Sequence, residues 1–181
     1  MSFEQKLLIL AGLAILIALV IVAVRPAGGA SGDDVRRHFG VPITTSLAVV
    51  AGALVVVGIV SHTLIRHMIQ IVPVIMVIIL LVRRPAMGLP AAAPLLAFWF
   101  LIMGGIWLFL LDFARVFTGT FSPAEIALTL VIGLACLFGL TMAYRQAVAT
   151  PMGQRIGTVV VFGFLQFAAM WLSVQPSITL R

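Results

Sequence analysis

Few side chains in this sequence could carry chemistry, and the densest group lies near the middle of the first half of the chain. His62 and His67 stand five residues apart, with Arg66 between them. Imidazole nitrogens bind zinc and haem iron, but a zinc site needs three or four ligands, which no further cysteine or carboxylate cluster supplies. A haem held between membrane helices needs two histidines at matching depth, and the remaining histidine, His38, is expected on the opposite side of the membrane. We therefore predict no cofactor, and a redox protein that binds haem or a metal through His62 and His67 is the weakest of three functional alternatives.

A second charged pair, Asp112 and Arg115, is three residues apart, which places both on one face if the segment is helical. Asp112 could pair with Arg115 or, across helices, with Arg66. Charged groups at membrane depth are costly and are usually paired or functional. The sequence predicts a structural ion pair here, with a substrate-binding or proton-relay role as the alternative. The candidate polar cluster comprises His62, Arg66, His67, Asp112 and Arg115.

One local signal is clear: Ser122-Pro123-Ala124-Glu125 has the pattern of a capping box with proline at the first helical position. A helix is predicted to begin at Pro123, with Ser122 as its cap and Glu125 as the reciprocal acceptor. Dinucleotide-binding, phosphate-loop, zinc-protease and serine-hydrolase motifs are absent from the sequence. No catalytic residue is therefore predicted, and the protein is not expected to be an enzyme.

Composition identifies the solvent that the chain must face. Hydrophobic residues make up 63% of the 181 residues and charged residues only 9%, with a mean hydropathy of +1.27. A soluble domain carries about 25% charged residues, so most of this surface must face lipid. The polar segment from Arg25 to Pro42 is too short to fold alone, which predicts one transmembrane helical domain over residues 1–181 and no separate soluble domain.

The apolar segments predict an all-α, polytopic integral membrane protein built as a bundle of six transmembrane helices. The first segment is longer than a signal-peptide core and is predicted to be retained as a span. Small residues spaced four apart, Ala48 with Gly52 and Gly153 with Gly157, predict faces where helices pack closely. The expected spans are approximately 5–24, 43–61, 64–82, 94–118, 123–147 and 152–174.

The count of six depends on how Ile43–Val82 is read. As one rod it would be about 60 Å long, twice the hydrocarbon core, so we predict two spans with a hairpin tip at Ser61–His67. Six spans leave seven of the eleven basic residues on one side, and a single rod would leave almost no bias. The positive-inside rule then places both termini outside a bacterial-type inner (plasma) membrane. The seven are Arg25, Arg36, Arg37, Arg83, Arg84, Arg145 and Arg155.

The net charge of +6 sits at the ends of apolar spans, which indicates contact with anionic lipid at the arginine-rich inner loops and no nucleic-acid partner. Three function classes remain from the sequence. The first is a non-catalytic accessory subunit of a larger membrane complex, or a homo-oligomer. The second is a small transporter or channel with a polar site near the outer face, at Arg66, Asp112 and Arg115. The third is the redox protein named above.

Overall fold

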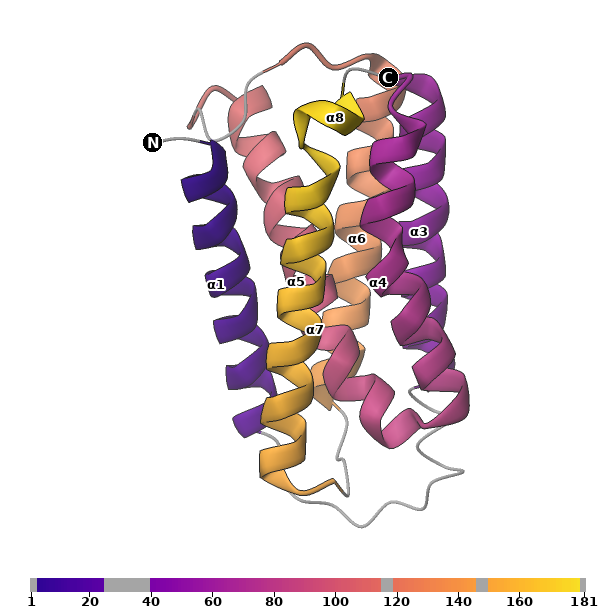
Figure 1. Ribbon diagram of the computed structural model, residues 1–181, viewed down its shortest axis with the longest axis vertical. Coiled ribbons are helices and arrows are strands. Elements are labelled where there is room, and N and C mark those ends of the chain that lie inside the picture. Colours follow the sequence, from indigo (N-terminus) through magenta and orange to yellow (C-terminus); the bar gives the residue numbers. More distant parts are fainter. Residues whose placement is uncertain (1–2, 25–39, 115–118, 146–149, 180–181) are drawn as a thin grey trace.

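The computed structural model describes residues 3–24, 40–114, 119–145 and 150–179, and these form a helical bundle (Figure 1). Six of its helices are long and apolar enough to cross a membrane, which confirms the predicted fold class. The helices are α1 (Phe3–Ala23), α3 (Val41–Val60), α4 (Leu64–Arg83), α5 (Pro85–Leu110), α6 (Pro123–Arg145), α7 (Met152–Ser173) and the short α8 (Pro176–Thr179).

The chain doubles back between α3 and α4, as predicted. The N–H of His62 donates to the carbonyl of Ile59 at 3.3 Å, and the N–H of Thr63 donates to the carbonyl of Gly58 at 2.8 Å. His62 has φ of 55°, so this is a Schellman motif with histidine at the position that glycine usually takes. The turn makes the number of crossings even, and the two ends of the chain lie at the same end of the bundle (Figure 1).

The fourth span is the one whose boundaries were predicted wrongly. It was expected over 94–118, but α5 covers Pro85–Leu110 and contains Pro90 and Pro94. Its end is a second Schellman motif: Asp112 has φ of 59°, and the N–H of Phe113 donates to the carbonyl of Leu108 at 2.9 Å. An aspartate tolerates the left-handed conformation better than most residues, so it ends the helix before Gly119 is reached. The other span boundaries agree with the prediction to within about two residues.

Helix α5 begins early because its neighbours accommodate its prolines. Pro90 has no N–H, so the carbonyl of Ala86 has no donor four residues ahead. The Thr150 hydroxyl donates to that carbonyl at 3.1 Å, and the Thr150 carbonyl in turn accepts from Nε of Arg155 at 2.6 Å. Membrane helices tolerate proline when a neighbour satisfies the freed carbonyl in this way. Figure 1 shows the first turns of α5 inclined to the rest of the helix, beneath α4.

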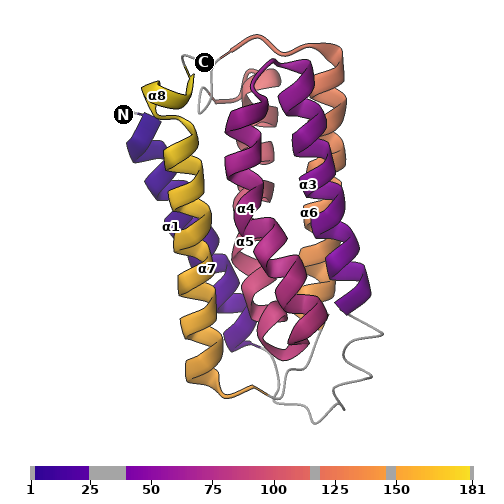
Figure 2. The ribbon, with the colours of Figure 1, turned by 45° about the vertical axis from the view of Figure 1, so that its right-hand side comes forward.

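Helix α5 is also the central helix of the bundle, in contact with α1, α4, α6 and α7. On one side α3 packs on α6, and on the other α1 packs on α7 (Figure 2). Close packing uses glycines other than the predicted ones. A Cβ on Gly139 would meet Leu96 of α5 and Ser46 of α3, and one on Gly163 would meet Ile15 of α1.

The predicted packing pairs lie on the outside instead. Ala48 is exposed, and a Cβ added to Gly52, Gly153 or Gly157 would meet no atom within 4 Å in the part of the chain that the structure describes. These two small-residue faces therefore make no helix contact within one chain.

Candidate functional site

A cavity of about 370 Å³ lies among α3, α4, α5, α6 and α7, next to the α3–α4 turn and the segment that precedes α6. Its polar lining comes from α4 and its turn on one side and from α6 on the other. Its apolar lining comes mainly from α5. The polar lining includes Ser61, Thr63, Arg66, His67, Glu125 and Thr129. The apolar lining includes Trp99, Ile102, Met103, Ile106, Ile132 and Met170.

The cavity extends deep into the bundle. Trp99 lies eleven residues before the end of α5 at Leu110, which is about 16 Å along a helix axis. This is roughly half of a hydrocarbon core about 30 Å thick. The Trp99 side chain is only 2% exposed, and its indole N–H has no hydrogen-bond partner in the described part of the chain. A buried donor without a partner is destabilising by about 1–3 kcal/mol, so this N–H is suited to an acceptor that a ligand brings.

Hydrogen bonds at the turn fix the protonation of the His67 ring. The Ser61 hydroxyl donates to the Val57 carbonyl at 2.7 Å, so the Thr63 hydroxyl must donate to Ser61 Oγ at 2.6 Å. Nδ1 of His67 lies 3.1 Å from the Thr63 carbonyl oxygen, which can only accept. Nδ1 therefore carries a proton, so when the ring is neutral Nε2 is an acceptor in a residue that lines the cavity.

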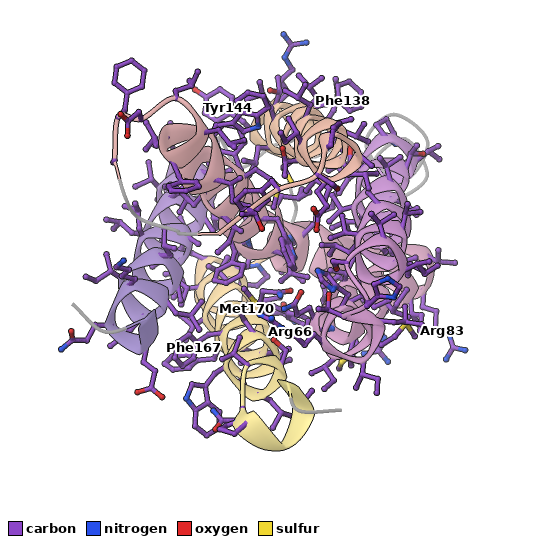
Figure 3. The ribbon with its side chains drawn as sticks, turned by 90° about the horizontal axis from the view of Figure 1, so that it is seen from above. Arg66, Arg83, Phe138, Tyr144, Phe167 and Met170 are labelled. Atoms are coloured by element: carbon purple, nitrogen blue, oxygen red, sulfur yellow. The ribbon has the colours of Figure 1, made fainter. Side chains whose placement is uncertain are left out.

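Arg66 supplies the positive charge of the site. Seen from above, Arg66 lies toward the middle of the bundle near Met170, whereas Arg83 of the same helix points outward (Figure 3). Its Nε is buried and has no hydrogen-bond partner among the residues described. A guanidinium is suited to planar anions because it presents parallel N–H groups to a carboxylate or phosphate.

Glu125 supplies the negative charge from α6, and its position is fixed by the helix cap. Its Oε2 accepts from the Ser122 N–H at 2.7 Å, and its own N–H donates to the Ser122 hydroxyl at 3.3 Å. Both hydrogen bonds of a capping box are thus present. Glu125 and Arg66 line one cavity, yet no ion pair joins them in the described structure. Each charge is therefore left without an opposite partner across the site.

Three buried polar residues that sequence reasoning did not select join α4 to α7. The Gln70 amide donates to the Ser173 hydroxyl at 2.9 Å, and the Gln166 amide donates to the backbone carbonyl of Gln70 at 3.3 Å. These bonds lie next to Pro73, which interrupts the hydrogen-bond ladder of α4. The available signal was an amide side chain within an otherwise apolar span, which usually faces another helix.

Only part of the predicted polar cluster comes together. Arg66 and His67 line the cavity, and Arg66 also lines a second recess together with His62 and Ile178. Asp112 follows the end of α5 and is exposed, and no ion pair joins it to Arg66, so the predicted cross-helix pair is not formed. Arg115 lies outside the described residues, as does His38.

The two histidines of the turn do not face each other, since His62 and His67 line different cavities. Within the described ranges, no group of three or more histidine, cysteine, aspartate or glutamate side chains could hold a metal ion.

Comparisons with protein-family models, with curated proteins and with solved structures find no match for this chain.

Proposed function

We propose that this protein binds a small amphipathic solute in the cavity beside α5 and carries it across the membrane. The observation that supports this most directly is the cavity that runs from Arg66, in the first turn of α4, to the buried Trp99, whose indole N–H has no hydrogen-bond partner among the described residues. Charged and unpaired groups at membrane depth are costly and tend to be kept for a ligand or a pathway. A volume of about 370 Å³ falls in the range of small-molecule sites, about 300–1,000 Å³.

The helices that border the cavity are suited to movement. Pro73 lies three residues from Gln70 in α4, and Pro94 lies five residues before Trp99 in α5, so both helices have interrupted backbone hydrogen bonding close to residues that line the cavity. Transporter sites are typically formed where membrane helices are interrupted near the middle of the bilayer. The amide bonds between α4 and α7 would then have to exchange partners as the site opens and closes.

The orientation is a proposal from charge. The polar mouth of the cavity lies at the end of the bundle that holds the α3–α4 turn and the two ends of the chain. Of the arginines predicted on the inner side, Arg83, Arg84, Arg145 and Arg155 lie in the described structure, and they are at the other end of the helices. In a bacterial-type inner membrane the positive-inside rule would place the mouth outside, with the arginines of the opposite end against anionic lipid.

Thiol labelling tests whether the cavity is open to water, as a solute site must be. In a Cys136→Ser background, Ile106→Cys places a thiol in the cavity, and Leu108→Cys places one on the exposed side of the same helix. In a bilayer, a membrane-impermeant cationic thiosulfonate should modify Ile106→Cys much faster, because a thiolate forms in water and not against lipid. Equal slow modification of both variants would contradict a solute-binding site.

A second candidate function is the non-catalytic one, an accessory subunit of a larger membrane complex or a homo-oligomer. It is favoured by the outward position of Ala48, Gly52, Gly153 and Gly157, which make no helix contact in the described chain. Such faces let helices of another chain approach closely. Native mass spectrometry of protein extracted gently from its own membrane should then show a dimer or a partner, which Gly52→Leu with Gly157→Leu should remove.

A further inference from the structure

We infer that the ligand is a zwitterion with an apolar body, whose anionic group binds Arg66 and whose ammonium group binds Glu125. This inference rests on the proposed solute-binding function and assigns the chemical class of the solute. The observation behind it is that one cavity is lined by a cation from α4 and an anion from α6 that do not pair with each other.

The balance of charge favours a ligand that carries both signs. A ligand with a carboxylate and no ammonium would pair with Arg66 but would bring a second negative charge toward Glu125. A simple amine would pair with Glu125 but would bring a second positive charge toward Arg66. Unpaired charges are much more destabilising in a low-dielectric site than in water. A zwitterion compensates both side chains and adds no net charge to the bundle.

The anionic end of the ligand is assigned to α4 by the donors there. Nε of Arg66 is buried and unpartnered, so the guanidinium still has hydrogen-bonding capacity toward the middle of the bundle (Figure 3). Charge-assisted bonds of a guanidinium to a carboxylate or a phosphate are about twice as strong as neutral ones.

The ammonium end is assigned to α6 by the acceptors that line the cavity. Glu125 uses Oε2 for the Ser122 N–H, which leaves Oε1. The Thr129 hydroxyl gives its proton to the Ile126 carbonyl at 2.7 Å, so its oxygen can only accept from a ligand. In its neutral form, His67 adds Nε2 as a third acceptor among the residues that line the cavity. A primary ammonium has three N–H donors, which these acceptors could satisfy.

The rest of the lining requires an apolar body. Ile102, Met103 and Ile106 of α5 line the cavity together with Ile132 of α6 and Met170 of α7, and Trp99 lines its deep end. Two sources supply this chemistry: a free amino acid with an apolar side chain, and the head group of a phosphatidylethanolamine lipid with its chains leaving the cavity. Both present an anionic group and a primary ammonium group.

The first experiment varies the charge of a single probe. Binding of L-leucine, N-acetyl-L-leucine and L-leucinamide to the purified full chain is measured by calorimetry. Leucine should bind at least about tenfold more tightly than either analogue, because one lost charge-assisted hydrogen bond is worth about 1.5–3 kcal/mol. Comparable binding of N-acetyl-leucine would overturn the zwitterion and leave the solute site standing.

Variants then assign each end of the ligand. Glu125→Gln keeps the cap hydrogen bond, because glutamine also serves in a capping box, but it removes the charge. Ser122→Ala is the matched control, which removes the cap side chain and keeps the charge. Glu125→Gln should abolish the preference for leucine over N-acetyl-leucine, and Arg66→Gln should abolish the preference over leucinamide. If Ser122→Ala has the same effect as Glu125→Gln, the carboxylate acts only through the helix cap and the inference is overturned.

Reconstitution in nanodiscs of defined lipid composition distinguishes a phosphatidylethanolamine ligand from a free amino acid. If the ligand is a lipid, the protein should retain phosphatidylethanolamine in preference to phosphatidylcholine, whose quaternary ammonium has no N–H, and Glu125→Gln should remove this preference. Preferential retention of phosphatidylglycerol over phosphatidylethanolamine would overturn the zwitterion inference but not the solute site. The same holds if no probe or lipid binds while Ile106→Cys still reacts with the thiosulfonate. An unreactive Ile106→Cys would remove the solute site itself.

Discussion

At the scale of single residues, His62 and Asp112 hold the left-handed conformation that ends α3 and α5. That conformation is unfavourable by roughly 1–2 kcal/mol for a residue with a Cβ, and glycine adopts it without this penalty. Neither residue is in an ion pair with Arg66 in the described structure. Their backbone role therefore accounts for their positions better than the polar cluster that the sequence predicted.

Replacing His62 with glycine should raise the free energy of unfolding by about 1 kcal/mol, because the left-handed strain is relieved. His62→Val should lower it, since a β-branched residue is strained most at positive φ. Thermal unfolding in detergent measures both variants. Ile65→Gly, at the second position of α4, is the control and should lower stability by up to about 1 kcal/mol through lost helix propensity. A destabilised His62→Gly would mean that the imidazole itself holds the hairpin.

At the scale of helices, the prolines of α5 are accommodated by contacts from other segments. In the described structure, the Thr150 hydroxyl is the only side-chain group that donates to the Ala86 carbonyl, and Thr150→Val removes this hydrogen bond. Ala86 is exposed, so water can replace part of this bond, and its loss should lower stability by about 0.5–1.5 kcal/mol, the net contribution of one hydrogen bond. Thr141→Val is the control, because the Thr141 hydroxyl is exposed and bonds within its own helix to Leu137. Chemical unfolding midpoints compare the two, and equal midpoints would argue against the role assigned to Thr150.

Helix packing gives a second prediction at this scale. A Cβ on Gly163 of α7 would clash with the Ile15 side chain of α1 and would come 3.6 Å from Pro94 of α5. Gly163→Ala should therefore lower stability by about 1–3 kcal/mol through overpacking. Gly157→Ala, on the same helix with open space around it, should be neutral or stabilising by up to about 1 kcal/mol. The stability of both variants is measured by unfolding in detergent. If Gly157→Ala were less stable than Gly163→Ala, this packing of α7 on α1 would be contradicted.

At the scale of the whole molecule, the start of α1 and the end of α8 lie at the same end of the bundle (Figure 1), and an even number of crossings predicts that both face one side of the membrane. Fusions of a reporter that is active on only one side should give the same signal at the two ends. The same reporter inserted after Arg84, between α4 and α5, should give the opposite signal. If the proposed orientation holds, the two ends report the outside. Opposite signals at the two ends would contradict the six-span fold itself.

The sequence by itself determined the membrane class, the six spans, the turn after Ser61 and the cap at Ser122 with Glu125. These features follow from local properties of the chain: the length of each apolar segment, the residues that cap a helix, and the few residues that form a turn. Only the tertiary structure decided where α5 begins, since the donor that satisfies the Ala86 carbonyl is Thr150, far along the chain. It alone decided that Arg66 shares a cavity with Glu125 rather than a bond with Asp112, because side chains on separate helices meet only when the bundle packs.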